Sequence, residues 1–168
     1  PGIRSLRSET MTESLSLRVL PDLAPSLAAE LRRAARDAPH QPFIRMAGGE
    51  WSYAQFDADT DRVAAGLHAL GVRCGDNVSL MLPNCIEFAV LWFALAKLGA
   101  VTAPVNTSFR GQVLLNAINL VESRLLLIHA SLLVALDTQR PQLSSIEQIL
   151  VVGGEPAHDC LCYETLWQ

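Results

Sequence analysis

The stretch from Leu82 to Arg110 constrains the fold of this chain more than any other segment. It begins at the end of an apolar strand, turns at Pro83 and Asn84, and continues as a helix from Ile86 to Leu98. A second apolar strand follows directly. The helix is apolar nearly all round, which predicts burial on most of its sides. A buried helix between two apolar strands is typical of a parallel sheet that is covered by helices.

The same region approaches the length of a membrane span, because Ile86 to Val105 is largely apolar. However, Glu87 and Lys97 lie inside it, and Gly99 and Pro104 interrupt it near the expected helix end. Charges inside a spanning helix are costly, and the break leaves a helix too short to cross a bilayer. We therefore expect no transmembrane segment.

Strands and helices alternate along most of the chain. The expected strands are 42–46, 50–52, 77–81, 101–105, 124–128 and 148–152. The expected helices are 24–38, 53–70, 86–98, 112–121 and 131–136. The first two strands form a small hairpin that reverses at Gly48 and Gly49. The later alternation predicts an α/β fold in three layers, with a mostly parallel sheet and helices on both faces.

Residues that start and stop helices support these boundaries. Ser52 and Asn84 are candidate N-caps of the helices that follow them. Gly71 and Gly99 stand where a helix ends in a left-handed residue, and Gly75 fits a turn for the same conformational reason. We expect the aromatic side chains of Tyr53 and Phe56 to anchor the helix that Ser52 begins.

Composition indicates a globular chain. Half of the 168 residues are apolar and only 18% are charged, which is not typical of a disordered protein. A chain of this length buries roughly 70% of its unfolded surface, enough for one domain. Residues 1–21 lack apolar periodicity and contain Met11, a candidate start; we expect them to form a mobile tail. We expect order from Asp22 onward.

The charge and the cysteine content argue against several classes of function, namely nucleic-acid binding, disulfide-stabilised secretion and zinc binding. The net charge is −4, and the densest basic group (Arg32, Arg33 and Arg36) shares its helix with acidic residues, so nucleic acid is not an expected partner. The four cysteines are Cys74, Cys85, Cys160 and Cys162. Without a secretory signal, we expect free thiols and a cytoplasmic location. Cys160, Cys162 and His158 match no common zinc spacing, so no metal site is predicted.

Other polar groups are weak candidates for catalysis or binding. Gly153 and Gly154 follow a strand as a phosphate loop does, but Glu155 and Pro156 come next, and a carboxylate and a missing N–H both oppose anion binding. We therefore interpret the glycines as a turn. His68 and His129 are interpreted as structural, and Ser52, Ser108 and Ser131 lack a recognisable His and Asp pairing.

Charged groups on the helices have structural interpretations as well. Asp57, Asp59 and Asp61 lie near a helix start, where carboxylates favour the macrodipole; a metal cluster is the alternative. Lys97 is the only lysine of the chain. We expect its ammonium to reach carbonyl groups at the helix end while its stem packs.

Several motifs, in order, resemble the early region of the AMP-forming acyl-CoA synthetases, the adenylate-forming ligase superfamily. The matching residues are 51–56 (WSYAQF), 66–67 (GL), 70–72 (LGV), 75–78 (GDNV), 82–84 (LPN), 87–88 (EF), 96–101 (AKLGAV) and 104–106 (PVN). The resemblance covers about Leu23 to Leu166. Residues 106–111 (NTSFRG) are most similar to carnitine-CoA ligase-like and fatty-acid-transport-type synthetases.

The resemblance implies that residues 22–168 are an incomplete, N-terminal part of an AMP-dependent synthetase/ligase large domain. Family enzymes join a carboxylic acid to ATP, release pyrophosphate and transfer the acyl group to coenzyme A, with Mg²⁺ and a lysine of a C-terminal domain assisting. The Ser/Thr/Gly-rich phosphate loop of the family is not in this sequence. We therefore expect no catalytic, cofactor-binding or metal-binding residue here.

Three functions remain open. The first is an N-terminal fragment of an acyl-CoA ligase that is inactive alone. The second is a stand-alone nucleotide- or acyl-binding module that uses the open end of the sheet. The third is an interaction module, in which helix 86–98 pairs with another subunit of a homo-oligomer.

Overall fold

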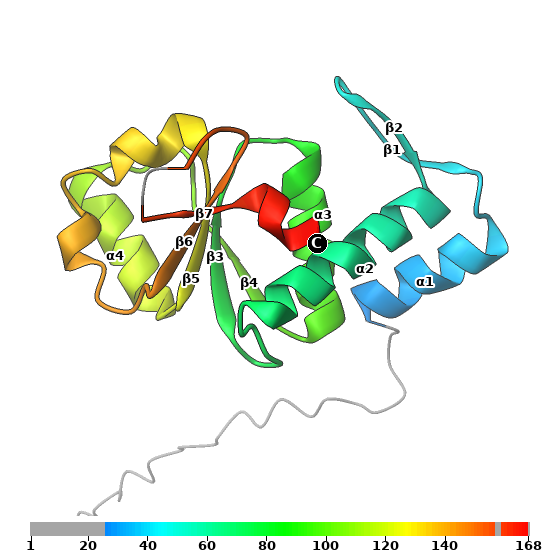
Figure 1. Cartoon of the computed structure of the whole chain (residues 1–168), viewed down its shortest axis with the longest axis horizontal. Coiled ribbons are helices and arrows are strands. Elements are labelled where there is room, and N and C mark those ends of the chain that lie inside the picture. Colours follow the sequence, from blue (N-terminus) through cyan, green and yellow to red (C-terminus); the bar gives the residue numbers. More distant parts are fainter. Residues whose placement is uncertain (1–25, 157–158, 168) are drawn as a thin grey trace, which may run out of the picture.

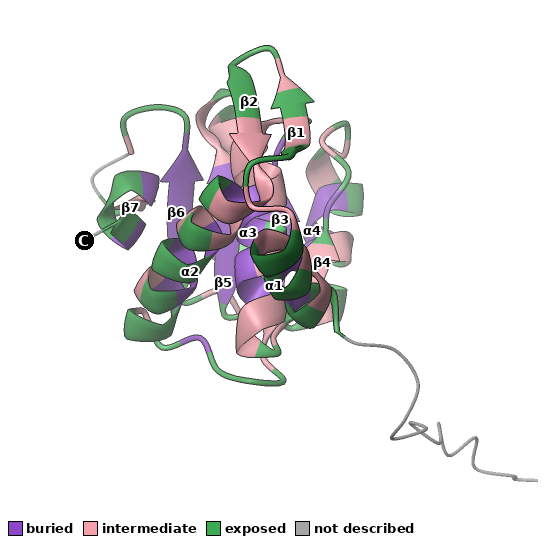
Figure 2. Ribbon diagram, turned by 90° about the vertical axis from the view of Figure 1, so that its right-hand side faces the viewer, coloured by how far each residue is buried: buried purple, intermediate pink, exposed green. Residues whose placement is uncertain are grey.

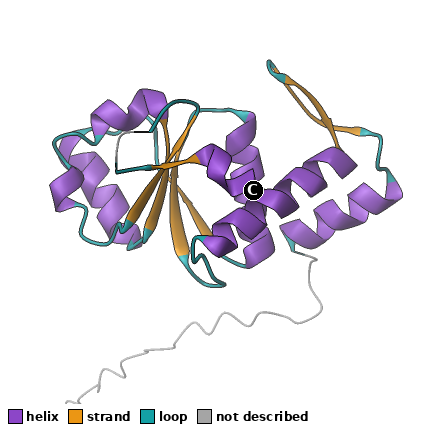
Figure 3. Ribbon diagram, in the orientation of Figure 1, coloured by secondary structure: helices purple, strands orange, loops and turns teal. Residues whose placement is uncertain are grey.

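The structure, a computed structural model, describes residues 26–156 and 159–167. The tail predicted for residues 1–21 therefore lies outside the described residues. A parallel sheet forms the centre of the molecule, with helices packed on both of its faces (Figure 1, Figure 3). A small hairpin extends away from this body beside the first two helices (Figure 1). The layered α/β fold predicted from the alternation is confirmed.

Five parallel strands make up the central sheet, in the order β4-β3-β5-β6-β7. They are β3 (Asn77–Met81), β4 (Val101–Pro104), β5 (Leu125–His129), β6 (Gln148–Val152) and β7 (Leu161–Cys162). In the register of β3, Leu80 lies opposite Pro104 of β4 on one side and Leu127 of β5 on the other. The central strands are almost wholly buried (Figure 2), as a sheet covered on both faces requires.

Alternate side chains of each strand enter two separate cores, because successive residues of a strand point to opposite faces. Leu80, Leu127 and Leu150 join one core, whereas Ile128 and Val151 join the other. The first core is covered by α1 (Leu27–Asp37), α2 (Tyr53–Ala69) and α3 (Ile86–Leu98). The second is covered by α4 (Gly111–Val121), by the 3₁₀ helix η1 (Ala130–Ala135), and by Leu136 and Leu143. The short 3₁₀ helix η2 (Arg140–Gln142) has no buried residue.

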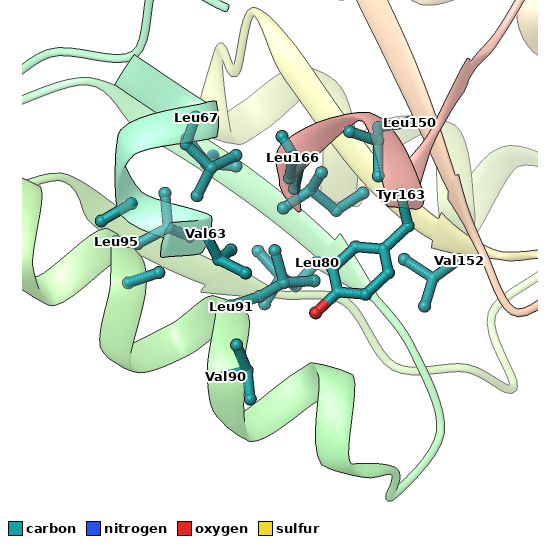
Figure 4. Close-up of a cluster of buried hydrophobic side chains, with 14 of the residues drawn as sticks. Val63, Leu67, Leu80, Val90, Leu91, Leu95, Leu150, Val152, Tyr163 and Leu166 are labelled. Atoms are coloured by element: carbon teal, nitrogen blue, oxygen red, sulfur yellow. The ribbon is translucent and has the colours of Figure 1, made fainter. Parts of the chain in front are cut away.

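A last 3₁₀ helix, η3 (Tyr163–Trp167), returns to the first core after β7. Tyr163 and Leu166 pack among side chains from the sheet, α2 and α3 (Figure 4). The backbone of η3 approaches α2 so closely that a Cβ on Gly66 would lie 2.5 Å from the carbonyl oxygen of Leu166. Gly66 therefore allows η3 to close this side of the core.

The hairpin consists of β1 (Pro42–Met46) and β2 (Gly49–Ser52), which pair antiparallel. Its base is attached to the body by aromatic packing. The Phe43 ring stacks on Tyr53 at a centroid distance of 4.6 Å and meets the edges of Phe56 and Phe93 at 5.2 and 5.9 Å. The anchoring role predicted for Tyr53 and Phe56 is thus confirmed.

The helix caps confirm most of the predicted boundaries. Ser52 caps α2 in a reciprocal capping box with Gln55. Gly71 and Gly99 both have positive φ, at 99° and 70°. The prediction for Asn84 was wrong: the N-cap of α3 is Cys85, without a side-chain hydrogen bond.

Other differences concern short elements after β5. The segment predicted as a helix over 131–136 is the 3₁₀ helix η1, and β7, η2 and η3 were not predicted. Helix α3 is packed against the first core along most of its length, as expected, although Trp92 remains 40% exposed.

Candidate functional site

The candidate ligand-binding edge of this fold is where the parallel strands end. The chain passes from β3 to β4 on one side and then crosses to β5 on the other side of β3. Open α/β sheets bind ligands beyond the carboxyl ends of the strands at such a reversal. The residues at this edge are Leu82 and Pro83 after β3, His129 at the end of β5, and Gly153 after β6.

His129 is the most polar side chain that a strand end brings to this edge. Its Nδ1 lies 2.8 Å from the Oγ of Ser131 and accepts a hydrogen bond from the Ser131 amide at 3.2 Å. Nδ1 therefore accepts from the backbone in this arrangement. The same contacts make His129 the N-cap of η1. His129 thus has hydrogen-bonding partners within the fold, as expected of a structural histidine.

Gly153 and Gly154 pack against the residues that follow β5. A Cβ on Gly153 would lie 2.6 Å from His129 Nε2, and one on Gly154 would lie 2.6 Å from the Cβ of Ala130. Gly153 also has φ of +75°, which a side chain disfavours. The pair therefore turns the chain closely against the end of β5, in agreement with the interpretation as a turn.

The loop after β4 is held by its own hydrogen bonds. Asn106 accepts from the amide of Ser108 at 2.8 Å. Arg110 donates to the carbonyl oxygens of Thr107 and Phe109, both at 2.7 Å. These contacts stabilise the turn that leads into α4. They also occupy the guanidinium of Arg110 with backbone carbonyl groups.

The other candidate residues are not gathered at the edge. Ser52 belongs to the capping box of α2, and His68 is exposed at the far end of that helix. The His68 carbonyl, rather than its ring, accepts a hydrogen bond from Arg73. Of the predicted serines and histidines, the structure brings together only His129 and Ser131.

Lys97 forms a buried ionic cluster that was not predicted from the sequence. Its side chain is 2% exposed. The ammonium donates to the carbonyl and Oδ1 of Asp57 at 2.8 and 2.6 Å, and to Oδ1 of Asp61 at 2.7 Å. The predicted contact with helix-end carbonyls was therefore wrong, because the partners lie on α2. The signal was the i, i+4 spacing of the two aspartates, which places them on one helix face.

The aspartates of α2 serve ion pairs rather than the helix dipole. The first turn of α2 contains no acidic residue. Asp59, the remaining aspartate, lies 3.5 Å from Arg62, and partial burial raises the pKa of its carboxyl. Among residues 26–156 and 159–167, no three His, Cys, Asp or Glu side chains are grouped as a metal site. His158 lies outside the described residues.

All four cysteines are free, as predicted. Cys85 is the most affected by its surroundings: burial at the start of α3 raises the pKa of its thiol to about 11. Burial also raises the pKa of the Tyr163 hydroxyl. None of the helices in the described part of the chain is long and apolar enough to cross a lipid bilayer.

A family model described as AMP-binding enzyme matches residues 31–165 of this sequence. The chain belongs to the AMP-binding enzyme family. Human long-chain fatty acid transport protein 6 is 38% identical over 120 residues, which cover 71% of this chain and 19% of that protein. A crotonobetaine/carnitine–CoA ligase from Salmonella arizonae is 39% identical over 117 residues, or 69% of this chain and 21% of the ligase.

Two crystal structures of such enzymes share the fold. An anthranilate CoA ligase in complex with anthranoyl-AMP has a TM-score of 0.81 and 24% identity, over 87% of this chain and 29% of that one. The N-terminal domain of FACL13 from Mycobacterium tuberculosis has a TM-score of 0.72 and 27% identity, over 82% and 39%. The chain spans about a fifth of the length of the curated relatives named above. The predicted resemblance is confirmed.

Proposed function

We propose that this chain is the N-terminal portion of an AMP-forming acyl-CoA ligase. In its intact form, such an enzyme converts a carboxylic acid, ATP and coenzyme A to acyl-CoA, AMP and pyrophosphate. We further propose that the chain alone supplies scaffold and does not activate an acid. The match of residues 31–165 to the AMP-binding family carries the proposal, and the curated relatives named as a CoA ligase and a fatty acid transport protein agree with it.

The donors of the described residues fit a triphosphate poorly. The sole lysine, Lys97, is enclosed by Asp57 and Asp61. The space behind Gly153 is filled by the His129 ring, and Glu155 follows in the chain. A site for ATP and Mg²⁺ requires free cationic or amide donors around the phosphates and carboxylates around the metal. We therefore propose that the reacting groups of the intact enzyme lie outside residues 26–156 and 159–167.

A chimeric enzyme tests the proposed role. Residues 31–165 would replace the matching segment of the Salmonella arizonae crotonobetaine/carnitine–CoA ligase, and acid-dependent formation of AMP and acyl-CoA would be measured. We expect activity, because the transplanted segment has the same fold and supplies no reacting group. A chimera that folds like the parent, by circular dichroism and gel filtration, yet forms no AMP contradicts the proposal.

The second candidate is a stand-alone nucleotide- or acyl-binding module. The reversal of strand order between β3 and β5 favours it, because open sheets bind ligands at that place. Calorimetric titration of the chain with ATP, AMP and a fatty acid distinguishes the two. Saturable heat of binding for any one of these ligands supports the binding module. If none of the three ligands binds, this candidate is excluded.

A further inference from the structure

Two thiols lie on one face of the sheet at its edge strand β7. Cys160 packs against the second core, whereas Leu161 packs against the first. Cys162 is paired in register with Val151, which belongs to the second core. Because paired residues of neighbouring strands point to the same face, both thiols are on the side of the second core. We propose that this pair is a site of reversible oxidation, at which a small-molecule disulfide converts both thiols to an intramolecular disulfide.

The spacing of the two cysteines allows a disulfide after a small adjustment of the backbone. Two residues of a parallel strand span about 6.6 Å, and the Cα atoms of linked cysteines are at most about 6.8 Å apart. Strand β7 has only two residues and stands at the end of the strand order, so few hydrogen bonds resist its bending. A bridge closed in this way is strained, and strained disulfides are readily reduced. The oxidation is therefore reversible.

The two sulfur atoms have different partners. Arg140 donates a hydrogen bond to Sγ of Cys160 at 3.4 Å, so a thiolate formed there has a cationic donor beside it. Sγ of Cys162 donates to a carboxylate oxygen of Glu164, and this hydrogen bond raises the pKa of the Cys162 thiol. Because the thiolate is the attacking species, Cys160 attacks the oxidant first and Cys162 reacts second.

The groups beside Cys160 leave room for an incoming disulfide. Arg140 and Asp159 form an ion pair at 2.8 Å, and both line an open cavity of about 350 Å³ whose other walls include Ile146 and Ile149. Small-molecule sites have volumes of about 300–1,000 Å³. A disulfide of a small peptide carries carboxylate and ammonium groups, and the ion pair presents a partner for each. Glutathione disulfide has this chemistry.

The reaction balances with glutathione disulfide as the oxidant. Cys160 loses its proton to solvent, and its thiolate attacks one sulfur of the oxidant, whose S–S bond breaks to release one glutathione as a thiolate. Cys162 then loses its proton, and its thiolate attacks Sγ of Cys160 and expels the second glutathione. Two protein thiols are oxidised, one glutathione disulfide is reduced to two glutathione molecules, and the two protons end on these.

Mass spectrometry of the full 168-residue chain tests the proposal. The folded chain is incubated with glutathione disulfide at neutral pH, and the remaining thiols are then alkylated in urea. We expect the peptide that contains Cys160 and Cys162 to carry no alkyl group and no glutathione, and to have lost two hydrogen atoms. Dithiothreitol should restore both thiols. Alkylation of both cysteines, or glutathione retained on both, would overturn the proposal.

Variants separate the two steps. Cys162→Ser should stop at a mixed disulfide of glutathione with Cys160, and Cys160→Ser should take up glutathione more slowly. Glu164→Gln should speed closure severalfold, because the Cys162 thiol then ionises more readily. The matched variant Glu30→Gln, which removes a carboxylate bound to Arg33, should close at the wild-type rate.

Concentrated urea supplies the last control, because unfolding removes the contact of Glu164 with Cys162. The wild type and Glu164→Gln should close at equal rates there. The proposal is overturned if Glu164→Gln and Glu30→Gln close equally fast in the folded chain. It is also overturned if Cys160→Ser takes up glutathione as fast as Cys162→Ser.

Discussion

Among single residues, Lys97 has the largest structural role that the sequence did not reveal. Its side chain is almost wholly buried, and three oxygen atoms of α2 accept hydrogen bonds from its ammonium. The contact joins α3 to α2 across the first core. Charges removed from water are tolerated when hydrogen-bonded partners surround them, and loss of one partner leaves the others unsatisfied. Lys97 therefore holds two helices in register.

Replacement of Lys97 by Met tests this role. The change keeps the apolar stem but leaves Asp57 facing the core without its cation, so we expect the free energy of unfolding to fall by about 3 kcal/mol. Urea denaturation measures it. The control is Asp61→Asn, because Asp61 is half exposed and loss of an exposed pair costs under about 1 kcal/mol. An equal loss of unfolding free energy in the two variants would contradict this role of Lys97.

The thiol of Cys85 offers a pH-dependent test. Burial raises its pKa from 9.0 to about 11, so its rate of alkylation by iodoacetamide should reach half its maximum near pH 11. The folded form holds the thiol proton more tightly than the unfolded form. Its contribution to stability is therefore full below pH 9 and is lost as pH rises toward 11. Mass spectrometry of the Cys85 peptide reports the rate, and a midpoint near pH 9 would refute the burial.

At the scale of elements, the sequence predicted strands better than their connections. The bounds of β1, β3, β6 and α3 were predicted correctly, because apolar runs between turn residues specify them locally. Strand β7 has only two residues, too few for any pattern. The pairing of Lys97 with α2, and the hydrogen bond at 2.9 Å between buried Ser79 and Ser123, depend on contacts between distant residues. No local pattern reports such contacts.

The docking of η3 on α2 depends on Gly66. Gly66→Ala would place a Cβ 2.5 Å from the Leu166 carbonyl, so η3 must move, although alanine favours the helix by about 1 kcal/mol. We expect net destabilisation of about 1–2 kcal/mol and faster amide exchange in η3. The control is Gly48→Ala, whose Cβ would approach no atom closer than 4.0 Å. Unchanged exchange in η3 would show that the contact is dispensable.

At the scale of the whole molecule, the two cores and the reversal between β3 and β5 define a scaffold for a site at the strand ends. The sequence predicted the layers from the alternation of strands and helices. It did not predict which strand ends adjoin, because strand order is set by crossovers. The contact of Gly153 with the His129 ring, which joins the ends of two strands, was therefore visible only in the structure.

The most direct test of the proposed scaffold role is carboxylate-dependent exchange of pyrophosphate into ATP by the purified chain. A complete crotonobetaine/carnitine–CoA ligase, assayed with its own acid, serves as the positive control. We predict no exchange above background with short, long or aromatic carboxylic acids, because Lys97 is enclosed and the described residues offer no cradle for phosphate. Exchange that requires both the acid and Mg²⁺, and that persists through purification to homogeneity, would contradict the account.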